Sequence, residues 1–323
     1  MSRGTPVAEP FPWRDYLAPR HWPTWLGLGA LRLIAALPFD AALALGRALG
    51  PATLARLPDR ARVTDRNLAL AFPELDAGAR ARLARETFRQ IGMAFTETAW
   101  GWYRDPAGYA ERFRIEGAEH LDAAVARGRG VILLQGHFTL IDFSGHAMCT
   151  RWPISSVYDP PKDPLWEAVQ RRHRERWMVR MIPNRDIRSM VRMLRAGEIV
   201  WFSPDQYVSP RRGGVETRYF GQPVSTSSGT ARMLQMTGAA LVPLVPERSE
   251  DGSRYTLRLL PAVPVDPSDT VGATQAINDL LEAQVRERPA QYLWVHRRFK
   301  PPRPGVPDPY AAEASGASAP VDA

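Results

Sequence analysis

The chain has 323 residues, enough to bury the core of one large domain or two modest ones. Hydrophobic residues make up 45% and charged residues 24%, which is typical of a globular protein and excludes a largely disordered chain. The single cysteine, Cys149, excludes a disulfide framework and a cysteine-based zinc cluster, and a small buried thiol in a reducing compartment is expected. A net charge of +8 favours nucleic acid, anionic membranes or acidic proteins as partners, and composition does not choose among them.

The N-terminal part of the chain divides into a polar and an apolar segment. Residues 1–21 contain four prolines and show no periodicity, whereas residues 22–50 are mostly apolar and are interrupted at Pro38. Trp22 and Trp25 are typical of a membrane–water boundary. The first apolar run is shorter than the roughly 20 residues that a membrane span needs. We therefore expect 22–50 to form a membrane-anchoring or interfacial helical hairpin; a buried core helix is the alternative.

A basic cluster follows this segment directly and consists of Arg56, Arg60, Arg62 and Arg66. Arginines beside an apolar segment favour the cytoplasmic face of a membrane and its anionic lipids. We therefore expect the protein at the cytoplasmic face.

The remaining sequence predicts helices first and then alternating strands and helices. Residues 59–105 have helical periodicity, and Asp76 is a suitable N-cap within them. From Phe113 onward, strand and helix patterns alternate, which predicts an α/β domain with a mixed, largely parallel sheet flanked by helices. The expected strands are RFRIEG, GVILLQG, ISSVYD, EIVWFSP, ALVPLVPER, YTLRLLPAV and YLWVHRR, and the expected helices are 118–128, 164–177, 186–196, 227–238 and 271–288. We expect 311–323 to be a disordered tail, because it is rich in Ala, Ser and Pro.

A candidate catalytic pair follows the apolar strand GVILLQG. His137 stands at the carboxyl end of this strand, where ligands bind in open α/β sheets. Asp142 comes five residues later, and a turn could bring its carboxylate to the imidazole. Such a carboxylate fixes the tautomer of the ring and stabilises its protonated form. The pair could therefore act as a general base on a hydroxyl group, although the spacing alone is a weak signal and a structural histidine is the alternative.

The other histidines are weaker candidates. His146 lies four residues after Asp142 and could complete a metal site with it and His137, but no further ligand has suitable spacing, so we expect no metal. His173 lies among arginines, and its surroundings favour a solvated or phosphate-facing surface. His296 lies in the arginine-rich segment HRRFK.

Two further segments could contribute to a site. Asp205 stands at the carboxyl end of the apolar strand IVWFSP, again at the ligand edge of the sheet. The hydroxyl-rich run 225–230 precedes an expected helix, and could present amides of Ser228, Gly229 and Thr230 to an anion or a carbonyl oxygen. Ordinary helix capping is the alternative.

Together these segments resemble the lipid A biosynthesis lauroyl/myristoyl acyltransferases, the late acyltransferases of the lysophospholipid acyltransferase superfamily. The likeness runs from about Pro19 to Tyr310. His-x4-Asp is evidence only for the superfamily, whereas VWFSPDQ and QYLWVHRRFK are much more specific. Other matching stretches are HWPTWLGLG, RNLALAFPEL, IEGAEHL, GVILLQGHFTLIDFSG and FGQPVSTSSGT.

The resemblance implies a glycerolipid acyltransferase-like fold over residues 51–310 and transfer of a fatty acyl chain from acyl-carrier protein to a hydroxyacyl group of a lipid A precursor. It implies that His137 is the base and Asp142 its orienting partner. It also places Arg174, Arg176 and Asp205 on the family's substrate-binding positions. Close relatives often carry glutamate at position 142, and Asn184 stands where an arginine is frequent, so that segment receives no role.

The chemistry of the residues agrees with this reading. Arginines suit the phosphates of the acceptor, and the candidates are Arg171, Arg172, Arg174 and Arg176. The net positive charge suits an acidic carrier protein. The expected partners are acyl-carrier protein, a lipid A precursor and the bacterial inner membrane, with no nucleic acid. No cofactor is expected beyond the acyl-carrier-protein thioester that donates the acyl chain.

Three alternatives stay open. The same chemistry could act on another acceptor, such as a lysophospholipid or an ornithine lipid. The chain could be a basic membrane-binding or nucleic-acid-binding protein without catalysis, although no nucleic-acid-binding motif is found. An esterase is disfavoured, because the sequence has no Gly-x-Ser-x-Gly elbow.

Overall fold

The computed structural model describes residues 11–311. The start of the polar segment 1–21 and the expected disordered tail, apart from Ala311, lie outside this range. The helices are α1 (Trp22–Ala36), α2 (Phe39–Arg56), α3 (Pro58–Ala71), α4 (Ala77–Tyr103), α5 (Ala118–Ala126), α6 (Ile141–Cys149), α7 (Pro164–Arg174), α8 (Ile187–Arg195), α9 (Gly229–Thr237) and α10 (Thr270–Glu287). The strands are β1 (Phe113–Glu116), β2 (Val131–Leu134), β3 (Ile154–Tyr158), β4 (Met181–Pro183), β5 (Ile199–Phe202), β6 (Gly214–Tyr219), β7 (Gln222–Ser227), β8 (Ala240–Arg248) and β9 (Tyr255–Leu259).

A mixed seven-stranded sheet organises the fold in the order β1-β9-β8-β2-β5-β3-β4. Neighbouring strands pair in parallel except β8 and β9, which are antiparallel. The central strand β2 is buried along its whole length, as its uninterrupted apolar sequence requires of a parallel strand covered on both faces. This confirms the predicted α/β class.

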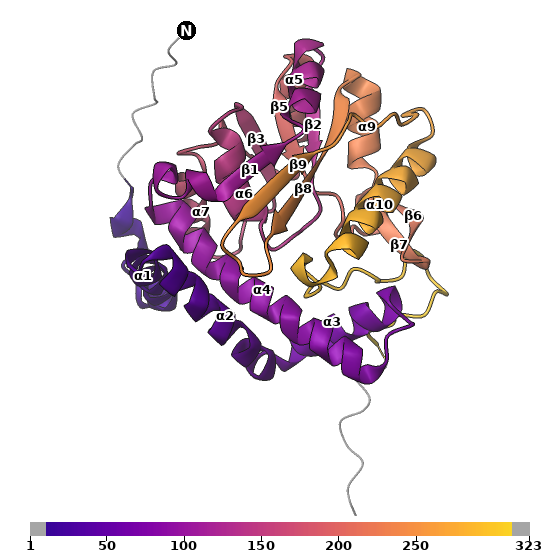
Figure 1. Cartoon of the computed structure of the whole chain (residues 1–323). Coiled ribbons are helices and arrows are strands. Elements are labelled where there is room, and N and C mark those ends of the chain that lie inside the picture. The colour runs from indigo at the N-terminus through magenta and orange to yellow at the C-terminus, as the bar shows by residue number, and fades with distance from the viewer. Residues whose placement is uncertain (1–10, 312–323) are drawn as a thin grey trace, which may run out of the picture.

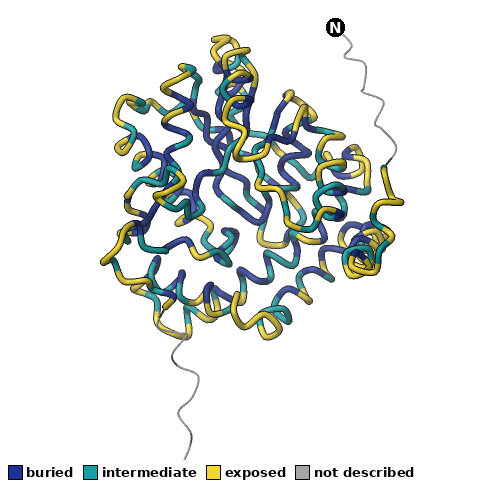
Figure 2. Tube along the Cα trace, turned by 180° about the vertical axis from the view of Figure 1, so that it is seen from behind, coloured by how far each residue is buried: buried dark blue, intermediate teal, exposed yellow. Residues whose placement is uncertain are grey.

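Helices cover both faces of the sheet. Residues of α8, α9 and α10 pack on one face, and residues of α5 and α6 pack on the other. Figure 1 shows α1 to α4 gathered as a layer along one end of the sheet. The strands at the centre are buried, whereas the outer turns of the surrounding helices are exposed (Figure 2).

Local sequence signals determine where the helices begin. The Asp76 carboxylate accepts a hydrogen bond of 2.7 Å from the backbone N of Ala79, which confirms the predicted cap of α4. Pro38 separates α1 from α2, as expected for the apolar segment 22–50, although α2 continues to Arg56. No helix within residues 11–311 is long and apolar enough to cross a membrane.

Glycines allow α2 and α4 to pack closely. A Cβ atom added to Gly46 would lie 2.5 Å from the carbonyl oxygen of Gly92, and one added to Gly50 would lie 2.2 Å from that of Phe88. The two helix backbones are therefore in direct contact, which a larger residue at either glycine would prevent.

Two predictions about strands need correction. The segment YLWVHRR is not a strand: its backbone is irregular and forms a single antiparallel bridge, between Phe138 and Tyr292. The hydroxyl-rich run 225–230 precedes α9 as expected only up to Ser228: Ser225–Ser227 form the end of strand β7, which pairs with β6 in a two-stranded hairpin, and Gly229 and Thr230 already belong to α9.

Candidate active site

His137 lies in the loop between β2 and α6, at the edge of the sheet where the parallel strands β2, β5 and β8 end. Its backbone is held in place by the irregular C-terminal segment. The carbonyl of His137 accepts a hydrogen bond of 2.9 Å from the backbone N of Leu293, and the backbone N of Thr139 donates to the carbonyl of Gln291 at 2.8 Å. The His137 side chain is 24% exposed, so a substrate can reach the ring.

Asp205 is the carboxylate that contacts His137. Its Oδ1 lies 2.6 Å from Nδ1 of the ring, and its Oδ2 accepts hydrogen bonds of 2.8 Å from the backbone N of His137 and from the Tyr292 hydroxyl. Burial alone would raise the pKa of Asp205, but the electrostatic interaction with the His137 side chain and these hydrogen bonds lower it to about 2. Because Asp205 is ionised, Nδ1 of the neutral ring carries the proton, and Nε2 is the free acceptor.

The predicted pairing of His137 with Asp142 is wrong in this structure. Asp142 lies in the first turn of α6, and its Oδ1 accepts a hydrogen bond of 2.8 Å from Nε of Arg174. Burial opposes ionisation of Asp142, but the neighbouring guanidinium of Arg174 keeps its pKa below the usual value. Asp205 therefore occupies the place beside the ring that the sequence assigned to Asp142, while a catalytic role for each residue stays a prediction.

A narrow pocket of ≈ 10 Å³ adjoins the ring and is also lined by Asn67, Trp294 and Arg298. Arg298 is buried, and it donates to the carbonyl of Ser225 at 3.0 Å and to Oγ1 of Thr226 at 2.7 Å. Its Nε has no hydrogen-bond partner within residues 11–311. Burial lowers the pKa of Arg298, and the negative charge of nearby Asp205 partly opposes this shift. The site thus combines an imidazole, a carboxylate and a buried guanidinium.

Comparison with known proteins identifies the family. The sequence profile of the bacterial lipid A biosynthesis acyltransferases matches residues 11–301. The chain is 34% identical to the lipid A biosynthesis lauroyltransferase of Escherichia coli (strain K12), over 91% of this chain and 96% of the relative. It is 35% identical to the palmitoleoyltransferase of the same organism, over 89% and 94%, and 27% identical to the myristoyltransferase, over 92% and 93%. The chain belongs to the bacterial lipid A biosynthesis acyltransferase family.

Three of the four arginines that the sequence assigned to substrate phosphates bind other groups of the acyltransferase. Arg174 is bound to Asp142, and Arg176 donates to the carbonyl of Trp102 at 3.0 Å. Arg171 forms an ion pair along α7 with Glu167 at 3.3 Å, and Arg172 is exposed. Substrate binding by these residues stays a prediction.

The N-terminus of α9 also differs from the expectation. The Ser228 hydroxyl does not cap α9; it donates to the carbonyl of Gly213 at 2.7 Å. The backbone N of Gly229 donates to Oγ of Ser227 at 3.2 Å, and the buried Thr230 hydroxyl has no partner within residues 11–311. Anion binding by these amides is therefore still a prediction.

The remaining titratable candidates are buried, as His146 is, or partly buried, as His173 and Cys149 are. Burial is the main cause that lowers the pKa of His146 and the pKa of His173 to about 4. Both rings are therefore neutral at pH 7. Burial raises the pKa of Cys149 to about 12, which makes its thiol unreactive at neutral pH. No group of three or more His, Cys, Asp or Glu side chains in the described part of the chain is arranged to hold a metal ion.

A wider pocket lies away from this chemistry, at the other edge of the sheet. It has a volume of ≈ 460 Å³ and is lined by Gly130 and Ala240, which stand at the amino ends of β2 and β8, together with Val263. His137 lies beyond the carboxyl end of β2, at the opposite edge of the sheet.

The sequence did not single out Tyr292 or Arg298, although both lie in QYLWVHRRFK, the segment that carried much of the resemblance. It placed Asp205 at the correct edge of the sheet but did not join it to His137. One signal in the sequence could have joined the two residues. His137 stands three residues beyond Leu134, and Asp205 stands three residues beyond Phe202, where Leu134 and Phe202 are the paired ends of β2 and β5.

Proposed function

We propose that this acyltransferase moves a fatty acyl chain from an acyl-carrier-protein thioester to a hydroxyacyl group of a lipid A precursor, with His137 as general base. The observation that carries the proposal is the hydrogen bond between Asp205 and Nδ1 of His137 at the ligand edge of the sheet, in a chain of this family. A hydroxyl group is a poor nucleophile, and a positioned imidazole typically contributes about 10²–10⁴-fold to the rate of such a reaction.

The reaction proceeds in two steps. In the first, Nε2 of His137 takes the proton of the acceptor hydroxyl while its oxygen attacks the thioester carbonyl carbon, and a C–O bond forms. In the second, the oxyanion collapses, the C–S bond breaks, and the imidazolium returns the proton to the thiolate of the carrier. Asp205 stays ionised throughout and stabilises the imidazolium, and the Tyr292 hydroxyl keeps the carboxylate in place.

The exposed surface of α1 supports a position on the inner membrane. Trp22 is 59% exposed, Leu26 75% and Leu33 72%, while Leu28 and Leu31 on the other side of α1 are buried against the protein. Apolar side chains on one face of a surface helix favour insertion into the interface of a bilayer. We therefore place α1 along the membrane surface, with the basic cluster that follows α2 directed to anionic lipids of the cytoplasmic leaflet.

A basic stripe on α8 supports an acidic carrier protein as the donor. Arg188, Arg192 and Arg195 of α8, together with Arg185 just before it, recur at three- and four-residue spacing and are all exposed. None of them forms an ion pair within residues 11–311, whereas many other surface arginines do. The strand before α8, β4, lies three strands from β2, or roughly 14 Å at the usual strand spacing. Because β4 is parallel to β3, the N-terminal end of α8 with Arg188 follows the carboxyl edge of the sheet, the edge at which His137 lies, and Arg195 lies at the other end of the helix.

The test is an acyl-transfer assay on membranes that contain the protein, with a panel of acyl-carrier-protein thioesters and a tetra-acylated lipid A precursor. Wild type and the control His120→Ala are expected to add one acyl group, and His137→Ala is expected to add none. Product formed only with lysophospholipid or ornithine lipid would change the acceptor, and fatty acid release without acceptor would indicate an esterase. Full activity of His137→Ala would overturn the mechanism.

The donor is tested separately. Reversing charges on α8 with Arg188→Glu and Arg192→Glu is expected to raise KM for the carrier thioester and leave KM for the lipid unchanged. Arg82→Glu with Arg85→Glu, two exposed arginines of α4, is the matched control. Equal KM values in both double variants would remove α8 as the docking surface.

A further inference from the structure

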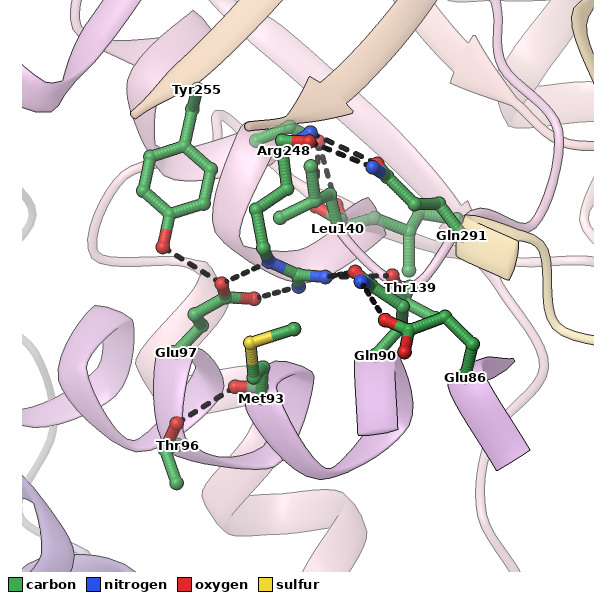
Figure 3. Close-up of polar contacts among 12 residues, drawn as sticks. Glu86, Gln90, Met93, Thr96, Glu97, Thr139, Leu140, Arg248, Tyr255 and Gln291 are labelled. Atoms are coloured by element: carbon green, nitrogen blue, oxygen red, sulfur yellow. Dashed lines mark hydrogen bonds and ion pairs between the residues drawn. The ribbon is translucent and has the colours of Figure 1, made fainter. Parts of the chain in front are cut away.

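A buried ion pair joins α4 to the end of β8. The side chains of Arg248 and Glu97 are 0% and 1% exposed, and two hydrogen bonds connect them: Nε to Oε1 at 2.7 Å and Nη2 to Oε2 at 2.5 Å. The Tyr255 hydroxyl donates to Oε1 of Glu97 at 2.8 Å, and the Gln90 carbonyl oxygen accepts from Nη1 of Arg248. Figure 3 shows the guanidinium enclosed by these partners.

Such a pair is not needed to keep α4 against the sheet. Replacing a buried ion pair by apolar residues of similar volume is often neutral or stabilising, because desolvation offsets the attraction of the charges. Hydrogen bonds do, however, fix direction and distance more narrowly than apolar contacts do. The role of the pair is therefore better understood from the contacts that Arg248 makes with residues other than Glu97 than from the contribution of the pair to stability.

Gln291 connects the ion pair to the loop of His137. Its Oε1 accepts from the backbone N of Arg248 at 2.9 Å, and its Nε2 donates to the carbonyl of Arg248 at 2.8 Å (Figure 3). Its own carbonyl accepts from the backbone N of Thr139, two residues after His137. Nη1 of Arg248 lies 3.5 Å from Oγ1 of the same threonine.

The two residues after Gln291 complete the connection. The Tyr292 hydroxyl holds Asp205, which in turn holds the imidazole, and the backbone N of Leu293 binds the carbonyl of His137. Both the backbone and the ring of His137 are thus held by residues 291–293. A shift of Gln291 would move both of these supports together.

We propose that Glu97, Arg248 and Gln291 form a positioning unit that fixes the His137 loop relative to α4 and the helix layer α1–α4. These three residues act through Thr139, Tyr292 and Asp205, and they do not touch substrate. The inference rests on the proposed function of His137 as base. If His137 is the base, its imidazole must keep a fixed position relative to the helix layer that contains α1, and the positioning unit holds it there.

The first test is Gln291→Met, which removes both hydrogen bonds to Arg248 at similar volume and without a charge. We expect kcat to fall by about 10- to 100-fold, because a misplacement on the order of 1 Å can cost this much, while KM for both substrates changes little. The matched control is Gln284→Met: Gln284 is also buried, but its amide has no hydrogen-bond partner within residues 11–311. Its kcat should equal that of the wild type.

The second test removes both charges with Glu97→Gln and Arg248→Met together, so that no buried charge is left alone. A purely structural role predicts an unchanged kcat once the variant is folded, whereas a positioning role predicts a reduced kcat at unchanged KM. Should Gln291→Met fail to fold, this double variant decides between the two. Wild-type kcat in folded Gln291→Met, or in the folded double variant, overturns the proposal, whereas an inactive wild type would overturn the proposed function instead.

Discussion

Asp205 and Asp142 are two carboxylates near the same edge of the sheet, but they bind different partners, and Asp205 is fully buried whereas Asp142 is only partly buried. Asp205 binds the imidazole of His137, and Asp142 binds the guanidinium of Arg174. Asp142 is five residues from His137 in sequence, and Asp205 is 68 residues away. The comparison shows that the pairing of strands, and not the distance along the chain, brings the carboxylate to the base.

The register of the sheet gives the physical reason. β2 and β5 are parallel neighbours in which Leu134 pairs with Phe202, and the residues three positions further on meet. Asp142 is carried away from the ring because α6 begins at Ile141, so its carboxylate faces the adjacent α7. The predictions for Asp205→Asn and Asp142→Asn test this division of roles between the two carboxylates, and a third concerns His146, which lies in the same helix as Asp142.

The largest effect is expected from Asp205→Asn. The amide keeps the shape of the side chain but cannot stabilise the imidazolium or fix the tautomer of His137 as the carboxylate does. We expect kcat to fall by about 10²–10⁴-fold, the range of a general-base contribution, with little change in KM. Steady-state acyl transfer measures it, and circular dichroism checks the fold. A loss of less than threefold would show that Asp205 does not support the base.

Asp142→Asn is expected to lower stability and not the chemical rate. It leaves the partly buried guanidinium of Arg174 without its carboxylate, which we expect to cost about 2 kcal/mol, between the values for exposed and fully buried pairs. Denaturant unfolding measures the free energy, and kcat per folded molecule should stay at the wild-type value. Asp59→Asn, in an exposed pair with Arg62, is the control and should cost less than about 1 kcal/mol. Equal losses in both variants would contradict this account.

The smallest effect concerns pH and His146, which lies in the same helix as Asp142. Burial lowers the pKa of His146 to about 4, against an ordinary value of 6.5. The unfolded chain therefore binds more protons between these values, so stability falls as pH drops from about 6.5 toward 4. His146→Leu should reduce the loss between pH 7 and pH 4.5 by about 2 kcal/mol. Denaturant midpoints at both pH values measure it, and an unchanged loss would contradict burial of a neutral ring.

The sequence predicted much of the fold because its signals are local. The apolar strand before His137, the cap at Asp76 and the break at Pro38 are each contained in a few residues, and the structure has all three. The short strand β4 was missed because its three residues are too few to show a period. Residues 292–298 were taken for a strand because Tyr292 and Trp294 alternate as strand residues do, but each enters the core from irregular backbone.

The site could be predicted only in part. His137 and Asp205 were placed at the ligand edge from the ends of their strands, which is local information. The partner of His137 depended on which strands are neighbours, and the positions of Tyr292 and Arg298 depended on how a segment without regular structure returns to the sheet. These relations join residues far apart in the chain, and no local pattern contains them.

The most direct test of the central claim compares kcat/KM of Asp205→Asn and Asp142→Asn in one preparation series, normalised to folded protein. The account predicts that Asp205→Asn loses nearly as much activity as His137→Ala, whereas Asp142→Asn keeps the wild-type value. The reverse order, with Asp142→Asn as inactive as His137→Ala and Asp205→Asn active, would contradict it and return Asp142 to the place beside the base.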